Sequence, residues 1–146
     1  MNTTLVELDG VTKTYERGAS EVHALTDVSL AVSRGQMVVL LGPSGSGKTT
    51  LLNVVGAIEP ATSGRVTVAG VDVPALAGRD LDDYRRNQVG FVFQFFNLVP
   101  TLTARENVEV IAELCGPSAG RRSDEALEQV GLAEKADHFP GQLSGG

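Results

Sequence analysis

The segment Gly42-Pro43-Ser44-Gly45-Ser46-Gly47-Lys48-Thr49 constrains the fold most, because it fits the phosphate-binding pattern G-x-x-x-x-G-K-[ST] at every fixed position. The apolar run Met37–Leu41 before it predicts a buried strand, and the segment from Thr50 predicts a helix. A strand that leads through a glycine-rich turn into a helix directs several backbone N–H groups at one point, where the helix dipole adds positive potential. The sequence therefore predicts a nucleoside-triphosphate site here, in preference to a simple turn.

The residue types of this loop have separate chemical roles. Glycine is required where the backbone needs a positive φ or approaches the phosphates closely. Lys48 supplies a cation for the β- and γ-phosphates, and the Thr49 hydroxyl is a ligand for Mg²⁺. Thr50, the next residue along the predicted helix, completes the predicted binding set. The pattern alone leaves open which nucleotide is bound and whether it is hydrolysed.

Composition narrows the class of protein. The 146 residues carry a formal net charge of −6, which argues against non-specific binding of nucleic acid. The single Cys115 cannot form an internal disulfide, and no apolar run approaches the roughly 20 residues that span a bilayer. The N-terminus lacks the pattern of a signal peptide. We expect a soluble cytoplasmic protein that would need a partner to attach to a membrane.

The segments around the loop predict an antiparallel β layer beside an α/β core that starts at Met37. Asp9-Gly10 predicts a hairpin turn between two strands, Arg17–Ser20 predicts a second turn, and Arg34-Gly35 breaks the chain before the loop. The predicted strands are Leu5–Asp9, Val11–Tyr15, Val22–Leu25 and Val28–Val32, and Arg65–Val73 predicts a strand and a turn.

The rest of the chain predicts one more core strand, Val89–Phe93, and then a helical subdomain. Thr103 and Glu106 fit a capping box at the start of a helix over Ala104–Leu114. The other predicted elements are a helix over Leu81–Asn87, a linker over Gly116–Gly120 and a helix over Ser123–Val130 ended by Gly131. The predicted fold is α/β, a P-loop NTPase core of about residues 1–94 followed by helices over about 95–146. With two core strands, the core sheet is expected to be incomplete.

The order of these motifs resembles the nucleotide-binding domain of ATP-binding-cassette (ABC) transporters, from about Leu5 to Gly146. Tyr15 stands where that family has an aromatic residue ahead of the loop, and Gln94 in Phe91-Val92-Phe93-Gln94 matches the Q-loop glutamine. Leu143-Ser144-Gly145-Gly146 matches the signature motif of the family. Without the resemblance, we would interpret Tyr15 as an aromatic residue packed in a strand, Gln94 as an ordinary loop residue and the terminal segment as a linker.

The resemblance implies ATP and Mg²⁺ as ligands. Tyr15 would then stack on adenine, and Thr49 and Gln94 would face the metal ion. Two such domains would pair head to tail, so that Ser144, Gly145 and Gly146 would contact the γ-phosphate held by the partner subunit. ATP would thereby hold the dimer closed.

The resemblance also implies a membrane-spanning partner. In the family, the segment after the glutamine helps to form a groove for a short helix of the membrane subunit, which makes Phe95, Phe96 and Leu98 candidate groove residues. Core packing is the alternative for each of them. The sequence of Phe93–Val108 is similar to that of the family branch that serves lipoprotein release, macrolide efflux and antimicrobial-peptide export. The implied location is peripheral, at the inner face of the cell membrane.

The given residues depart from the family after the Q-loop. No apolar run after Phe93 ends in an Asp-Glu pair, and His138 precedes the signature motif, so the catalytic general base is not identified. His23 and His138 are expected to be structural. The 146 residues alone are expected to hydrolyse ATP negligibly, and Gly146 is not expected to be a natural stop. The alternatives are a non-transport ABC ATPase of repair, translation or cell division, a truncated ATP-binding protein without hydrolysis, and a short P-loop kinase or GTPase.

Overall fold

The structure is a computed structural model that describes residues 4–18, 20–114 and 119–144. The chain divides into two compact units, Met1–Phe91 and Val92–Gly146. Each unit has its own buried core, so each is described by itself.

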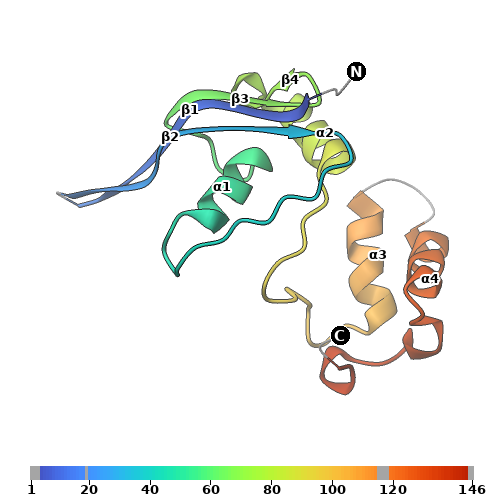
Figure 1. The fold of residues 1–146 in the computed structure, drawn as a ribbon. Coiled ribbons are helices and arrows are strands. Elements are labelled where there is room, and N and C mark those ends of the chain that lie inside the picture. Colours follow the sequence, from blue (N-terminus) through green and yellow to red (C-terminus); the bar gives the residue numbers. More distant parts are fainter. Residues whose placement is uncertain (1–3, 19, 115–118, 145–146) are drawn as a thin grey trace. The chain divides into compact units, whose positions relative to one another are not determined.

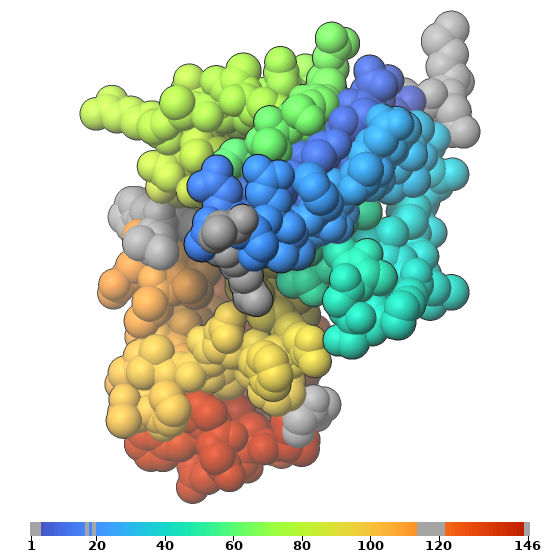
Figure 2. Space-filling model, turned by 90° about the vertical axis from the view of Figure 1, so that its left-hand side faces the viewer, coloured from blue at the N-terminus to red at the C-terminus, as the bar shows by residue number. Residues whose placement is uncertain are grey.

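The first unit contains an antiparallel sheet with the strand order β2-β1-β3-β4 (Figure 1). Figure 2 shows β3 in green beside β1 in dark blue, with β2 in lighter blue on the other side of β1. The predicted antiparallel β layer is therefore confirmed. The strands are β1 (Thr4–Arg17), β2 (Ser20–Ser33), β3 (Ser63–Val68) and β4 (Val71–Asp72).

The predicted hairpin turn at Asp9-Gly10 is wrong, because β1 runs through it as one strand. The pairing of β1 with β2 shifts register between Leu8 and Val11, which marks a bulge. Gly10 has a φ of 58° there, and its N–H donates to Ser29 Oγ at 3.0 Å. Hydrogen bonds to neighbours on both sides keep the chain in the sheet, so a turn-type dipeptide becomes a bulge.

The first unit also contains two helices. They are α1 (Lys48–Val55) and α2 (Gly78–Gln88), with a 3₁₀ turn η1 (Val73–Ala75) between β4 and α2. The α2 side chains hold the C-terminal end of α1: the Tyr84 hydroxyl donates to the Val55 carbonyl at 2.9 Å, and Arg85 Nη2 donates to the Ala57 carbonyl at 2.6 Å. The buried core members are Leu8, Val11, Leu25, Val54, Ala57, Val66, Val68, Val73 and Tyr84.

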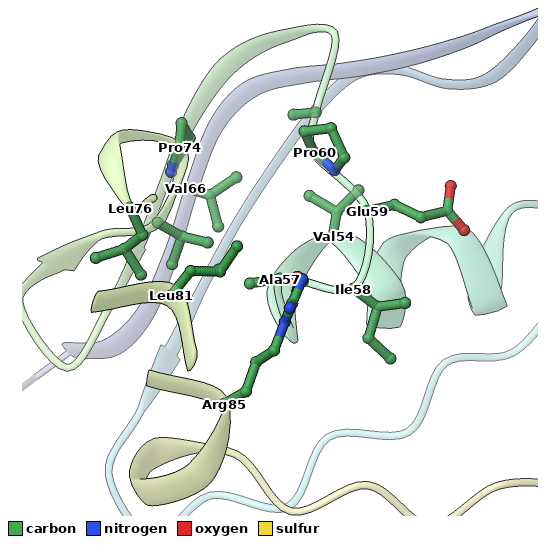
Figure 3. A pocket seen from close by; sticks show the side chains of 12 residues that line it. Val54, Ala57, Ile58, Glu59, Pro60, Val66, Pro74, Leu76, Leu81 and Arg85 are labelled. Carbon is green, nitrogen blue, oxygen red and sulfur yellow. Dashed lines mark hydrogen bonds between the residues drawn. The ribbon is translucent and has the colours of Figure 1, made fainter. Parts of the chain in front are cut away.

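A small apolar cavity of about 170 Å³ remains between the end of α1, β3, η1 and α2. Figure 3 shows Val54, Val66 and Leu81 around it, with the Arg85 guanidinium reaching toward Ala57. Because the Arg85 charge is held on a carbonyl at the end of α1, it also complements the negative end of the helix dipole.

The two predicted core strands, Met37–Leu41 and Val89–Phe93, do not form strands. The side chains of Met37, Leu41 and Val92 are 93%, 88% and 97% exposed. A strand in a parallel sheet takes its hydrogen bonds from neighbouring strands, and neither segment is paired as a strand in the sheet of the described residues. The prediction of buried strands is therefore wrong for both segments, because apolar character alone does not supply a partner strand. The expectation of an incomplete core sheet agrees with this arrangement.

The second unit is helical. It contains α3 (Ala104–Leu114), α4 (Ala119–Gln129) and two 3₁₀ turns, η2 (Ala133–Lys135) and η3 (Pro140–Gln142). Its buried core is formed by Ala104, Leu127 and Ala136. None of the helices in the described part of the chain has both the length and the apolar character that spanning a bilayer requires.

The predicted capping box at the start of α3 is confirmed. The Thr103 N–H donates to Glu106 Oε2 at 2.7 Å, and the Glu106 N–H donates to Thr103 Oγ1 at 3.3 Å. The predicted helix over Ser123–Val130 exists but begins earlier, and Gly131 follows it with a φ of 73°. Cys115 and the Gly116–Ser118 part of the predicted linker lie outside the described residues.

Candidate functional site

The glycine-rich loop leads directly into α1. Gly47 is the N-cap of α1 and has a φ of 87°, in the left-handed region that favours glycine. A Cβ at this position would lie 2.4 Å from the Ala24 carbonyl oxygen and 3.1 Å from Leu25 Cδ2, both on β2. Gly47 is therefore required twice, once by its backbone conformation and once by its close contact with the sheet.

The N-terminus of α1 presents unsatisfied backbone donors. The first intrahelical bond is donated by the Leu51 N–H to the Gly47 carbonyl, at 2.8 Å. The N–H groups of Lys48, Thr49 and Thr50 precede it and so have no carbonyl partner within the helix. Among the described residues no side chain caps this end, and no acidic residue lies in its first turn. The helix start is thus an electropositive cluster of donors, suited to an anion.

Lys48 folds back over the loop. Its Nζ donates to the carbonyl oxygens of Gly42 at 2.9 Å and Pro43 at 2.7 Å, and to Ser46 Oγ at 3.3 Å. All three acceptors are neutral, so these contacts leave the positive charge of Lys48 uncompensated. The ammonium is held at the loop while its charge stays available to phosphate oxygens.

Tyr15 lies on β1 and is held against the α1 side of the sheet. Its hydroxyl donates to Glu59 Oε2 at 2.5 Å, and Asn53 Nδ2 donates to Glu59 Oε1 at 2.8 Å. These hydrogen bonds, first from Tyr15 and then from Asn53, hold the pKa of Glu59 below its ordinary value. The bond to Glu59 raises the pKa of Tyr15, while a weaker opposing effect comes from a hydrogen bond with the Thr50 side chain. The ring thus reaches the first turn of α1, next to the loop.

Glu59 and Lys13 were not predicted from the sequence as part of this site. Glu59 lies 44 positions from Tyr15, and a glutamate before a proline in a loop carries no signal of such a contact. Lys13 is two residues from Tyr15 on the same strand, which places both side chains on one face of the sheet. That periodicity is the one signal in the sequence that could have suggested Lys13.

A magnesium ion would need ligands beyond those of this unit. The Thr49 side chain is exposed at the start of α1. In the described part of the chain, no group of three or more His, Cys, Asp or Glu residues could hold a metal ion. Mg²⁺ keeps several waters and is commonly bound through substrate phosphates. The Thr49 hydroxyl, as one protein ligand, fits a Mg²⁺ ion that binds together with the nucleotide.

The remaining predicted site residues lie in the second unit. Gln94 is exposed at a bend, and Ser144 is exposed after η3. Phe96, Leu98 and Ser144 line one hollow of about 700 Å³, whereas Phe95 is 76% exposed and does not line it. The signature residues Gly145 and Gly146 lie outside the described residues.

The two histidines have local contacts. His23 Nδ1 lies 3.0 Å from Thr14 Oγ1 across the β1–β2 pair, and its Nε2 lies 4.0 Å from Glu21. The His138 carbonyl accepts a hydrogen bond from the Ala104 N–H at 2.8 Å, at the start of α3.

Comparison with known proteins identifies the family. Residues 25–146 match the model of the family described as ABC transporter. An ABC transporter ATP-binding protein of Thermotoga maritima is 45% identical over 97% of this chain and 62% of its own length. The macrolide export ATP-binding/permease protein MacB of Hyphomonas neptunium is 42% identical over 100% of this chain and 23% of its own length.

Among solved structures, the dimeric ATP-binding cassette MJ0796 bound to ADP and Pi is similar, with a TM-score of 0.84 and 40% identity. The match covers 97% of this chain and 64% of that chain. The chain therefore spans less than two thirds of the length of these relatives.

Proposed function

This chain belongs to the ABC transporter family, and from that premise we propose that its phosphate loop binds Mg-ATP. We further propose that the whole protein hydrolyses ATP to drive export or extraction of a substrate at a membrane. The observation that carries the proposal is the start of α1, where N–H groups without an acceptor in the helix and the Lys48 ammonium lie at the loop. Backbone donors, a helix dipole and an uncompensated cation are the chemistry that a triphosphate requires.

Within this site, different residues bind different parts of the nucleotide. The backbone N–H groups of Gly45–Thr50 surround the phosphates, and Lys48 exchanges its contacts with loop carbonyls for phosphate oxygens. Tyr15 offers a ring face to the adenine. The Thr49 hydroxyl would be a ligand of Mg²⁺, which neutralises phosphate charge when it is bound. Gln94 remains a proposed metal ligand on the family resemblance alone.

The signature motif acts across a dimer in this proposal. Ser144, Gly145 and Gly146 contact the γ-phosphate held by the phosphate loop of a partner subunit in a head-to-tail pair. The dimeric assembly of the related cassette MJ0796 supports this arrangement. A ligand that is fully bound only in the closed dimer shifts the population toward closure.

A membrane-spanning subunit is the proposed second partner, with the protein peripheral at the inner face of the cell membrane. Phe96 and Leu98 line a hollow in the second unit, and Phe95 lies exposed beside them in the sequence. Exposed aromatic and apolar residues around a hollow fit a short amphipathic helix. The relationship with MacB, whose name joins an ATP-binding part to a permease, supports such a partner.

A complementation experiment tests the catalytic proposal. The whole protein with Lys48→Ala and the whole protein with Ser144→Ala are each expected to lose nearly all ATPase turnover. A mixture of the two should regain turnover, because a mixed head-to-tail dimer contains one site with both residues intact. If the wild type is active and the mixture stays inactive, the trans role of Ser144 is wrong. If the Lys48→Ala protein turns over ATP normally, the phosphate-loop assignment is wrong.

A further inference from the structure

The ring of Tyr15 is fixed at three points, and this is the observation from which the inference starts. The hydroxyl donates to Glu59 Oε2 at 2.5 Å and also takes part in a hydrogen bond with the Thr50 side chain. Lys13 Nζ lies 5.0 Å from the centroid of the ring. A tyrosine that served as ordinary core packing would need a partner for its hydroxyl, but not this set of contacts on hydroxyl and face.

Glu59 is itself held in place by neighbours on both sides. Its second carboxylate oxygen accepts a hydrogen bond from Asn53 Nδ2 at 2.8 Å, on α1. Lys13 Nζ lies 3.9 Å from Glu59 Oε2 and donates to the Pro60 carbonyl at 2.9 Å. Figure 3 shows the Glu59 carboxylate directed away from the apolar cavity that its stem helps to line. The group is therefore oriented toward Tyr15 by the structure around it.

Lys13 closes one side of the aromatic ring. Its side chain is 12% exposed, so it is packed at this position and does not move freely in solvent. A planar base can stack only on a ring face that is open, which leaves the face opposite Lys13. The contact of Lys13 with the ring is also a favourable cation–π interaction, which adds to the restraint.

We propose that Glu59 is a positioning residue for nucleotide binding, which holds the Tyr15 ring so that one face receives the adenine of ATP. The inference rests on the proposed nucleotide function. Asn53 and Thr50 belong to α1, the helix whose N-terminus carries the phosphate site, so the network fixes the ring relative to the phosphates. A ring that is already in place when ATP arrives loses little freedom on binding, and this raises affinity for the base without any new contact.

The test measures affinity for Mg-ATP and for inorganic triphosphate with the full-length protein. Glu59→Ala and Tyr15→Phe each break the bond between the hydroxyl and the carboxylate, and each is expected to weaken ATP binding by about five- to ten-fold. Neither should change the affinity for triphosphate by more than about two-fold, since the phosphate loop is untouched. The double variant should lose no more than either single variant, because both remove the same bond.

Two further variants serve as controls for the comparison of ATP and triphosphate affinities. Glu59→Gln keeps an oxygen that accepts from the Tyr15 hydroxyl, so it should restore most of the ATP affinity. Glu16→Ala removes an exposed carboxylate next to Tyr15 on β1 and should bind both ligands as the wild type does. If Glu59→Ala fails to fold, Tyr15→Phe, which retains the ring, decides the outcome by the same two affinities.

The inference is overturned if Glu59→Ala and Tyr15→Phe bind ATP like the wild type, or if they weaken ATP and triphosphate equally. Its failure can be told apart from failure of the proposed function by Lys48→Ala. If Lys48→Ala abolishes ATP binding while the Glu59 and Tyr15 variants do nothing, only the positioning role is wrong. If Lys48→Ala leaves ATP binding intact, the phosphate site itself is wrong.

Discussion

The Asn107 side chain and the Val99 backbone form a reciprocal pair: the Val99 N–H donates to Asn107 Oδ1 at 2.8 Å, and Asn107 Nδ2 donates to the Val99 carbonyl at 3.1 Å. Asn107 Nδ2 also contacts the carbonyl oxygens of Leu102, at 3.0 Å, and Thr103, at 2.9 Å. One amide on α3 thus holds the segment that directly follows Phe96 and Leu98, the proposed docking residues for a membrane subunit.

Asn107→Asp should loosen this segment. The carboxylate keeps an acceptor for the Val99 N–H but loses every donor and faces three carbonyl oxygens, so we expect a loss of about 1–3 kcal/mol in the local stability. Hydrogen exchange of the Val99 amide, followed by mass spectrometry or NMR, should become faster. Asn87→Asp, on the exposed surface of α2, is the matched control and should leave that amide unchanged. Equal protection of Val99 in both variants would contradict the proposed clamp.

Two glycines separate the effect of crowding from that of backbone conformation. Gly64 has a φ of 92°, and a Cβ there would lie 2.5 Å from the Gly10 carbonyl oxygen and 2.6 Å from Val11 Cα. Gly70 has a φ of 81° with nothing within 4 Å of such a Cβ. Gly70→Ala should cost about 1 kcal/mol from the positive φ alone. Gly64→Ala should cost several times as much, because β1 and β3 must move apart.

Urea unfolding of the two glycine variants, compared with the wild type, measures the difference in the free energy of unfolding. Equal losses for the two would mean that the close approach of β3 to the bulge in β1 is not present in solution.

The capping box makes the second unit sensitive to acid. The Thr103 backbone N–H and then its hydroxyl hold the pKa of Glu106 below its ordinary value of 4.5. Because the pKa is lowered on folding, the contribution of Glu106 is fully present above 4.5 and is lost as the pH falls through the lower folded value. Glu106→Gln has no carboxylate to protonate and should show a flatter fall in stability below pH 4.5. The check is thermal unfolding as a function of pH, and an identical acid limb for both proteins would count against this account.

Local rules predicted the parts of the structure whose causes are local. The helix after the glycine-rich loop, the Thr103–Glu106 capping box and the bounds of α3 were predicted correctly, because each depends on residues within a few positions of one another. The prediction of a turn at Asp9-Gly10 was wrong because β1 stays paired with β2 and β3 on both sides of this dipeptide. The strands expected at Met37–Leu41 and Val89–Phe93 depend on partners that periodicity cannot supply.

The candidate site divides along the same line. The loop residues were proposed from their motif and Tyr15 from the family resemblance, whereas Glu59, which accepts a hydrogen bond from Tyr15, was not proposed. Its role depends on the fold of a distant loop and on Asn53 of α1, and neither is visible in the residues around Glu59. Contacts between residues far apart in the sequence, such as Tyr15 and Glu59, cannot be predicted from a single sequence.

The most direct test of the account is equilibrium binding of Mg-ATP to the full-length protein and to its Lys48→Ala variant, with Lys135→Ala as a matched loss of one positive charge. The account predicts that Lys48→Ala reduces ATP affinity at least about 100-fold, since a charge-assisted contact to phosphate is lost, and that Lys135→Ala binds as the wild type does. Equal affinity of the wild type and Lys48→Ala would contradict the claim that the loop Gly42–Thr49 is the nucleotide site.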